Sequence, residues 1–204
     1  MNPAIEAFNT RSVRFAAAAT LTSFAPLGCA LGSGVPGVPY VFVPSGEGPF
    51  PAVIVLHAKG GLSNHEIDFA RHLSGQGFMT AVVEYGVHGG VDNIDKGYDL
   101  LNAYPTVSPG RIGLVGFSRG AEVAIKFAEY SHRFSTRRVG AIVSYYTGAS
   151  SGNNSEQLPP ILLLHVSLDV HFSPERIKSF CEAQSKLGAR CEATIYEGVK
   201  HAFD

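Results

Sequence analysis

Three residues from separate stretches of the chain carry side chains that together could catalyse attack on a carbonyl group: Ser118, Asp169 and His201. A serine hydroxyl is a poor nucleophile at neutral pH and needs a nearby base to take its proton. The imidazole of His201 is suited to that role. The carboxylate of Asp169 could fix the imidazole tautomer and stabilise the imidazolium. We therefore take these residues as a candidate catalytic triad.

The serine lies in Gly116-Phe117-Ser118-Arg119-Gly120, a sequence of the form G-x-S-x-G. The apolar run Ile112–Val115 predicts a buried strand before it, and Ala121–Tyr130 predicts a helix after it. On such a strand-to-helix turn, a nucleophile elbow, the serine hydroxyl is pushed out of the sheet. The helix N-terminus also favours a developing negative charge. The alternative interpretation is a glycine-rich connection with an incidental serine.

Two further histidines lie close to Asp169 in the sequence. His165 lies inside an apolar run, which is typical of a core histidine, whereas His171 is either a substrate-side or a surface residue. His201 follows the last predicted strand in a Lys-His-Ala-Phe context. We therefore favour His201 as the base.

Strands and helices alternate along the chain. The predicted strands are Tyr40–Val43, Pro51–His57, Met79–Val83, Ile112–Val115, Val139–Tyr145, Ile161–Val166 and Cys191–Tyr196; the predicted helices lie between Ser63 and Gly75 and at Ile94–Tyr104, Ala121–Tyr130 and Pro174–Leu187. This order predicts an α/β domain, a mostly parallel sheet with helices on both faces. Ligand sites in such sheets lie at the carboxyl ends of the strands. Because Ser118, Asp169 and His201 each follow a predicted strand, we expect them at one edge of the sheet.

A glycine-rich loop, His57–Gly61, follows an early predicted strand. This is the usual origin of one of the two N–H groups in an oxyanion hole. His57 itself is expected to be a packing and hydrogen-bonding residue at the strand end. Just after the loop, Ser63 and Glu66 have the spacing of a helix capping box.

Composition limits the function classes. The 204 residues suggest one domain, and 45% hydrophobic with 16% charged residues indicate a globular chain. The net charge of −1 gives no basic field, so no nucleic-acid partner is expected. We expect no cofactor. We also expect no metal, since Asp92, Asp95 and Asp99 are predicted to form the solvated acidic face of a helix. The sequence leaves the oligomeric state open.

The three cysteines, Cys29, Cys181 and Cys191, do not form a disulfide framework, and no C-x-x-C occurs. Each is expected to be a small core or surface residue rather than a nucleophile. A bridge between Cys181 and Cys191 is conceivable in an exported protein. The spacing alone does not decide it, because a bridge depends on the distance between the two Cα atoms.

Residues 1–32 differ in composition from the single domain expected at 33–204. Arg11 and Arg14 precede an uncharged, Ala-rich run, and small residues follow at Gly28, Ala30 and Gly32. This pattern predicts an export signal, and hence a periplasmic or extracellular protein. The alternative is an Ala-rich N-terminal segment of a cytoplasmic protein.

Two short sequences adjoin this segment. Leu27-Gly28-Cys29 is similar to a bacterial lipoprotein box, which would allow membrane anchoring through the N-terminal segment. Gly32–Pro39 is predicted to be a Gly/Pro linker.

From Pro51 to the C-terminus the chain resembles the dienelactone hydrolase family of α/β-hydrolases. The matching sequences are P-A-V-I-V-L-H-A-K-G-G, R-I-G-L-V-G-F-S-R-G-A, P-P-I-L-L-L-H-V-S-L-D and Y-E-G-V-K-H-A-F. The last has the form Y-x-G-x-x-H-x-F, which carries the family's catalytic histidine. The resemblance implies an oxyanion hole made by the N–H of Arg119 and that of Lys59, with Ala58 as the alternative. It also implies cleavage of a small ester or lactone through an acyl-enzyme.

The chain departs from the founding enzymes of this family in several places. Those enzymes use a cysteine nucleophile, whereas Ser118, found in many relatives, points to a general esterase. They have a glutamate where this chain has Ala58-Lys59. They also have an arginine and a closing helix after the histidine, so we expect a minimal version or a truncated one with one sheet face less covered. Two alternatives remain: a non-catalytic hydrolase-like binding protein or inactive fragment, and an acyltransferase or peptidase of the same fold.

Overall fold

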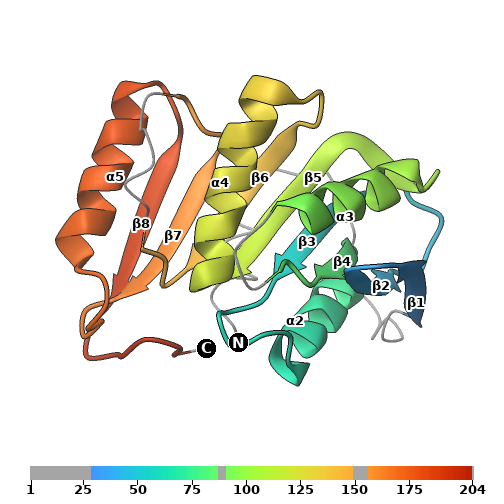
Figure 1. Ribbon diagram of the computed structural model, residues 1–204, viewed down its shortest axis with the longest axis horizontal. Coiled ribbons are helices and arrows are strands. Elements are labelled where there is room, and N and C mark those ends of the chain that lie inside the picture. Colours follow the sequence, from blue (N-terminus) through green and yellow to red (C-terminus); the bar gives the residue numbers. More distant parts are fainter. Residues whose placement is uncertain (1–28, 87–90, 149–155, 204) are drawn as a thin grey trace.

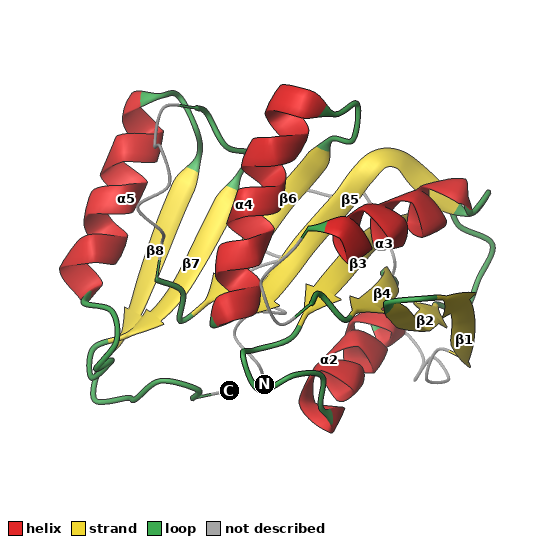
Figure 2. Cartoon of the chain, in the orientation of Figure 1, coloured by secondary structure: helices red, strands yellow, loops and turns green. Residues whose placement is uncertain are grey.

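The computed structural model describes residues 29–86, 91–148 and 156–203, which form one eight-stranded sheet with helices on both faces (Figures 1 and 2). The strands are β1 (Cys29–Val35), β2 (Val38–Val43), β3 (Phe50–Leu56), β4 (Met79–Val83), β5 (Val107–Phe117), β6 (Val139–Tyr145), β7 (Ile161–Val166) and β8 (Cys191–Tyr196). The helices are α2 (Asn64–Gly75), α3 (Asp92–Ala103), α4 (Arg119–Phe134) and α5 (Pro174–Lys186). No helix of the described residues combines the length and hydropathy needed to cross a membrane.

The strand order in the sheet is β1-β2-β4-β3-β5-β6-β7-β8. From β4 to β8 all neighbouring strands are parallel, whereas β2 runs antiparallel to both β1 and β4. The prediction of a mostly parallel sheet with helices on both faces is confirmed. The carboxyl ends of β5, β7 and β8 therefore lie along the same edge of the sheet, as Figure 1 shows.

Each face of the sheet has its own core. In β3, Ala52, Ile54 and Leu56 face the cluster that also holds apolar residues of α3, α4 and α5. Val53 and Val55 face the opposite cluster, to which α2 contributes. A strand covered on both faces reads as a continuous apolar run rather than an alternating one. The uninterrupted run in β3 follows from this double burial.

The N-terminal part of the sheet differs from the prediction. The prediction of a linker at Gly32–Pro39 was wrong. The strands β1 and β2 form an antiparallel hairpin there, with Gly37 in the turn at φ 83°. Gly and Pro are common in turns as well as in linkers. Gly37 suits this turn because glycine adopts positive φ without strain. The strand β1 starts at Cys29, inside the segment that composition set apart, while residues 1–28 of that segment lie outside the described residues.

The face of the sheet that carries α2 is covered unevenly. Within the described chain, α2 is the only helix on it and packs against β2, β3 and β4. The tail, residues 197–203, turns back along the carboxyl edge of the sheet, as Figure 1 shows. The ring of Phe203 lies 4.9 Å from that of Tyr196 and 6.3 Å from that of Tyr145, between ring centroids. Aromatic packing thus holds the tail against β6 and β8.

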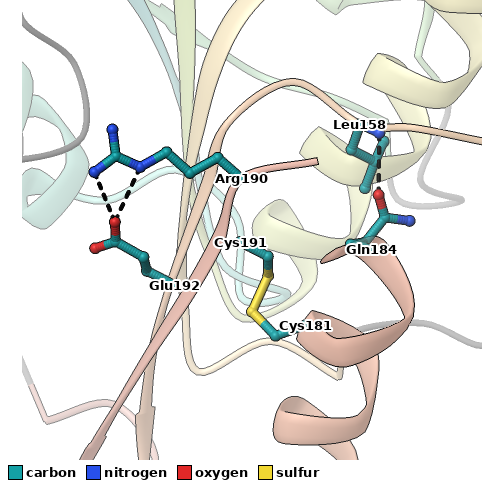
Figure 3. Close-up of a disulfide and its surroundings, with 6 residues drawn as sticks. All are labelled: Leu158, Cys181, Gln184, Arg190, Cys191 and Glu192. Atoms are coloured by element: carbon teal, nitrogen blue, oxygen red, sulfur yellow. Dashed lines mark hydrogen bonds and ion pairs between the residues drawn. A yellow bond between two sulfur atoms is a disulfide. The ribbon is translucent and has the colours of Figure 1, made fainter. Parts of the chain in front are cut away.

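A disulfide joins α5 to β8 (Figure 3). It links Cys181 and Cys191, whose Cα atoms are 5.2 Å apart, so the bridge that the sequence left open is present. Beside it, the buried Gln184 accepts a hydrogen bond from the N–H of Leu158 at 3.0 Å. The helix α5 is therefore fixed both to the edge strand and to the segment that leads into β7.

We expect replacement of both cysteines by alanine to destabilise the protein by about 2–3 kcal/mol. The reason is that a bridge across 10 residues restricts the unfolded chain. Urea unfolding of the double variant measures the change, and the wild type treated with a reductant should match it. Equal midpoints for all three samples would contradict a bridge that contributes to stability.

Candidate active site

The candidate nucleophile lies on a strained turn. Ser118 follows β5 directly and precedes the first residue of α4, with φ 51° and ψ −113°. Positive φ is uncommon for residues other than glycine and persists only where surrounding structure imposes it. One such restraint is the hydrogen bond from the N–H of Ser118 to the carbonyl of Tyr145 in β6, at 2.9 Å. The strand–turn–helix arrangement predicted around Ser118 is therefore present.

The two glycines of G-x-S-x-G are required by close backbone contacts. A Cβ on Gly120 would lie 2.4 Å from the carbonyl oxygen of His57, and one on Gly116 would lie 2.4 Å from the carbonyl carbon of Gly120. Distances below 3.0 Å are not tolerated between such atoms. These contacts pack the start of α4 against the end of β3, and so place the His57–Gly61 loop beside the elbow.

The structure brings the three candidate side chains together. The hydroxyl of Ser118 donates to Nε2 of His201 at 3.0 Å, and Nδ1–H of His201 donates to Oδ2 of Asp169 at 2.7 Å. The Asp169 side chain is fully buried, whereas 22% of the His201 side chain is exposed. Both distances lie in hydrogen-bonding range. A single imidazole thus connects a hydroxyl that can reach substrate with a carboxylate that water cannot reach.

Asp169 is held by its own loop. Its Oδ1 accepts hydrogen bonds from the backbone N–H groups of His171, at 2.8 Å, and Phe172, at 3.2 Å. Burial alone would raise the pKa of Asp169, but these bonds and the one from His201 outweigh it and hold the pKa below its ordinary value of 3.8. The carboxylate is therefore ionised throughout the neutral range.

His165 is a buried residue of β7, as predicted, but it also contacts the site. Its Nε2 donates to the carbonyl of Phe172 at 3.0 Å and lies 3.8 Å from Oδ2 of Asp169. It therefore supports the turn that orients Asp169. His171 is exposed, and its ring centroid is 5.3 Å from that of His201, so it lies at the rim of the site.

The sequence analysis did not predict the aromatic residues that pack around His201. The ring of Tyr146, at the end of β6, meets that of His201 edge-on at 4.7 Å between centroids, and Phe203 packs against Tyr146. Among the described residues, the non-glycine residues with positive φ are Ser118, Tyr146 and Ala202. All three lie at the site, where backbone strain tends to gather. The position of Tyr146 directly after a strand was the available signal, but sequence does not reveal its backbone conformation.

The loop after β3 is firmly held. His57 is buried and stacks on Tyr85 at 4.2 Å between ring centroids, in the packing role predicted for it. The Tyr85 hydroxyl donates to the carbonyl of His57 at 2.7 Å. Of the two residues considered as an oxyanion donor in this loop, Ala58 uses its N–H in a bond to Glu66, at 3.4 Å. That bond favours Lys59 as the donor.

A serine on an elbow after a central parallel strand, facing a histidine and an acid from later strand ends, defines the α/β-hydrolase class. The model of the family described as "Dienelactone hydrolase family" matches residues 82–204. The chain belongs to the dienelactone hydrolase family.

Solved structures with the same fold include a thermophilic esterase from Thermogutta terrifontis, with a TM-score of 0.69 and 19% identity, covering 87% of this chain and 84% of that one. The same esterase phosphonylated by sarin also matches, with a TM-score of 0.69, 17% identity and coverage of 89% and 87%. At these identities the likeness shows the fold alone.

Curated relatives are longer proteins. The peroxisomal succinyl-coenzyme A thioesterase of Mus musculus is 31% identical over 136 residues, which are 59% of this chain and 30% of that protein. Acyl-coenzyme A thioesterase 5 of Mus musculus is 31% identical over 103 residues, 44% of this chain and 23% of that protein. This chain thus matches less than a third of the length of these relatives.

We expect Gly120→Ala to lower stability by about 1–3 kcal/mol, because the new methyl group overlaps the backbone at the end of β3. Gly75→Ala is the matched control, since a Cβ there meets nothing within 4 Å. Urea unfolding of both variants measures the effect. A Gly120→Ala variant as stable as the control would contradict the close packing of α4 on β3.

The lowered pKa of Asp169 predicts a pH dependence of stability. The charged carboxylate stabilises the fold above the ordinary value of 3.8, and this contribution is lost as the pH falls through the lower pKa of the folded state. Asp169→Asn removes it. The wild type should therefore exceed Asp169→Asn in stability at neutral pH, and the gap should close in strong acid.

Unfolding free energies measured from neutral pH to about pH 2 test this dependence. Asp68→Asn, at an exposed position on α2, is the control and should follow the wild-type curve. A constant gap between the wild type and Asp169→Asn across the range would contradict the assigned direction of the shift.

Proposed function

We propose that the protein is a serine hydrolase that cleaves a small carboxylic ester or lactone through an acyl-enzyme. The observation that carries this proposal is the position of His201, within hydrogen-bonding distance of both Ser118 and Asp169. Family membership supports the reaction class. The fold shared with an esterase that is phosphonylated by sarin is consistent with it.

In the first half-reaction, Oγ of Ser118 attacks the carbonyl carbon while Nε2 of His201 takes the hydroxyl proton. Asp169 remains ionised and stabilises the imidazolium. The negative charge on the carbonyl oxygen is received by the backbone N–H groups of Arg119 and Lys59. The tetrahedral intermediate then collapses, and the leaving alkoxide takes the proton from His201, which gives an acyl-enzyme and a free alcohol.

In the second half-reaction, water attacks the acyl-enzyme with His201 again as base. The carboxylic acid leaves, and Ser118 recovers its proton. A lactone follows the same steps, except that the alcohol stays attached to the acyl group. The mouse relatives named as acyl-coenzyme A thioesterases make a thioester a second substrate to test, because both esters would form the same acyl-enzyme.

We also propose that the protein is exported. The disulfide Cys181–Cys191 supports this proposal, since such bonds persist mainly in oxidising compartments. The charged and apolar pattern of the N-terminal segment supports it too. Mass measurement of the N-terminus after expression in the native host tests it, and an intact Met1 or Asn2 would contradict export.

We expect Ser118→Ala to lower the turnover of p-nitrophenyl acetate by at least ~10⁴-fold, because the attacking oxygen is gone. A fluorophosphonate probe should label the wild type and Ser45→Ala, a change at an exposed turn, but not Ser118→Ala. Mass spectrometry of the labelled peptide identifies the site. A wild type that neither turns over the ester nor takes the probe would indicate a binding protein instead.

A further inference from the structure

We propose that Glu66 is a positioning residue that fixes the oxyanion loop, which we define as residues 57–62, the segment between β3 and the N-cap Ser63 of α2. The inference rests on the proposed hydrolase function and deepens it. From its sequence spacing, Glu66 is only the second member of a helix capping box. In the structure its carboxylate connects both ends of the oxyanion loop.

The two oxygens of the carboxylate have separate partners. Oε2 accepts from the N–H of Ser63 at 3.0 Å and from its hydroxyl at 2.7 Å. Oε1 accepts from the N–H of Ala58 at 3.4 Å, a longer bond at the start of the loop. Glu66 lies on the first turn of α2 with only 3% of its surface exposed. One buried group on a helix thus bridges the entrance and the exit of the loop.

A capping box explains the bond from the N–H of Ser63 to Glu66, but not the bond from Ala58. Capping the helix needs the bond to the backbone of Ser63 and leaves the other oxygen free to face solvent. Burying an ionised carboxylate is costly unless donors surround it. The bond to Ala58 compensates part of that cost, and in return it ties the strand end of β3 to α2.

The next peptide unit, between Ala58 and Lys59, is fixed through its carbonyl. The carbonyl of Ala58 accepts from Nδ1 of His57 at 2.7 Å and from the N–H of Gly61 at 3.2 Å. In a trans peptide the N–H points opposite to the carbonyl. The direction of the Lys59 N–H is therefore set by bonds that the rest of the loop makes, and Glu66 holds the peptide unit that precedes it.

The neighbouring strand supports the same loop. Burial raises the pKa of Tyr85, so its hydroxyl keeps its proton at all working pH values and donates to the carbonyl of His57. Gly120 of the elbow approaches that same carbonyl. Glu66 and Tyr85 thus hold the loop in a fixed position relative to Ser118.

Loss of Glu66 should weaken the stabilisation of the transition state more than the binding of substrate. The negative charge on the carbonyl oxygen develops fully only in the tetrahedral intermediate. We therefore expect kcat to fall and KM to change little.

A more specific signature is the preference for a carbonyl ester over its thionoester, in which sulfur replaces the carbonyl oxygen. Sulfur is a poor hydrogen-bond acceptor, so a well-ordered oxyanion hole accelerates the oxygen ester selectively.

The test compares Glu66→Gln and Glu66→Ala with Ser63→Ala. Glutamine has one acceptor oxygen and presents an NH₂ group to one of the two loop N–H donors. Ser63→Ala removes the capping hydroxyl and leaves both backbone bonds to Glu66 in place. For the Glu66 variants we expect kcat on the oxygen ester to fall by roughly 10–100-fold, with a parallel fall in the ratio of oxygen-ester to thionoester rates. For Ser63→Ala both should stay within about twofold, while the melting temperature falls through the lost cap.

The rate ratio is independent of how much of a variant is folded, because both substrates are measured on the same preparation. If the wild type hydrolyses the ester and the ratio of both Glu66 variants equals that of Ser63→Ala, Glu66 is a helix cap only and the inference is wrong. If the wild type hydrolyses neither substrate and Ser118 takes no phosphonate, the proposed function itself fails. Fluorophosphonate titration of each preparation separates these results.

Discussion

The site depends on the contact between the first turn of α4 and the end of β3. Gly120 approaches the carbonyls of Leu56 and His57 so closely that no side chain fits between them. This contact fixes the distance between the elbow that carries Ser118 and the loop that carries Lys59. Neither the nucleophile nor the proposed oxyanion donors could be aligned if the helix stood off by the width of a methyl group. The polar groups of the site can therefore be aligned only if these two backbone segments pack closely.

Around this contact, the parallel sheet supplies the remaining groups from its carboxyl edge. Asp169 follows β7, and His201 follows β8 after a short irregular segment. Asp169 is fixed by backbone N–H groups of its own loop, whereas His201 packs against aromatic rings in addition to its hydrogen bonds. The ring contacts leave both imidazole nitrogens to Ser118 and Asp169, as the proposed proton transfer requires.

Much of this arrangement could be predicted from sequence, for identifiable reasons. Strands buried on both faces leave apolar runs, so β4, β6 and β7 were predicted with the bounds that they have. The G-x-S-x-G sequence indicates a turn where the backbone is too crowded for a Cβ. This constraint acts on neighbouring residues, so it can be recognised from sequence. The β1–β2 hairpin was missed because Gly and Pro are common to linkers and turns alike. The role of Tyr146, the bridge at Cys181 and the second contact of Glu66 depend on how separate elements pack together in space, which no local pattern encodes.

The tail that carries His201 has a consequence for how the protein responds to heat. Residues 197–203 contain no helix. The ring contacts of Phe203 with Tyr196, Tyr145 and Tyr146 anchor their end. Two hydrogen bonds, from Gly198 to Ser167 and from Leu168 to Val199, hold their start. Segments with few buried contacts open at a lower free energy than the core does, and they do so without global unfolding. His201 can therefore detach while the sheet, the elbow and the α5–β8 cross-link persist. We therefore expect thermal inactivation to begin as a reversible, local event, and amide exchange in the tail to be faster than in the strands beside it.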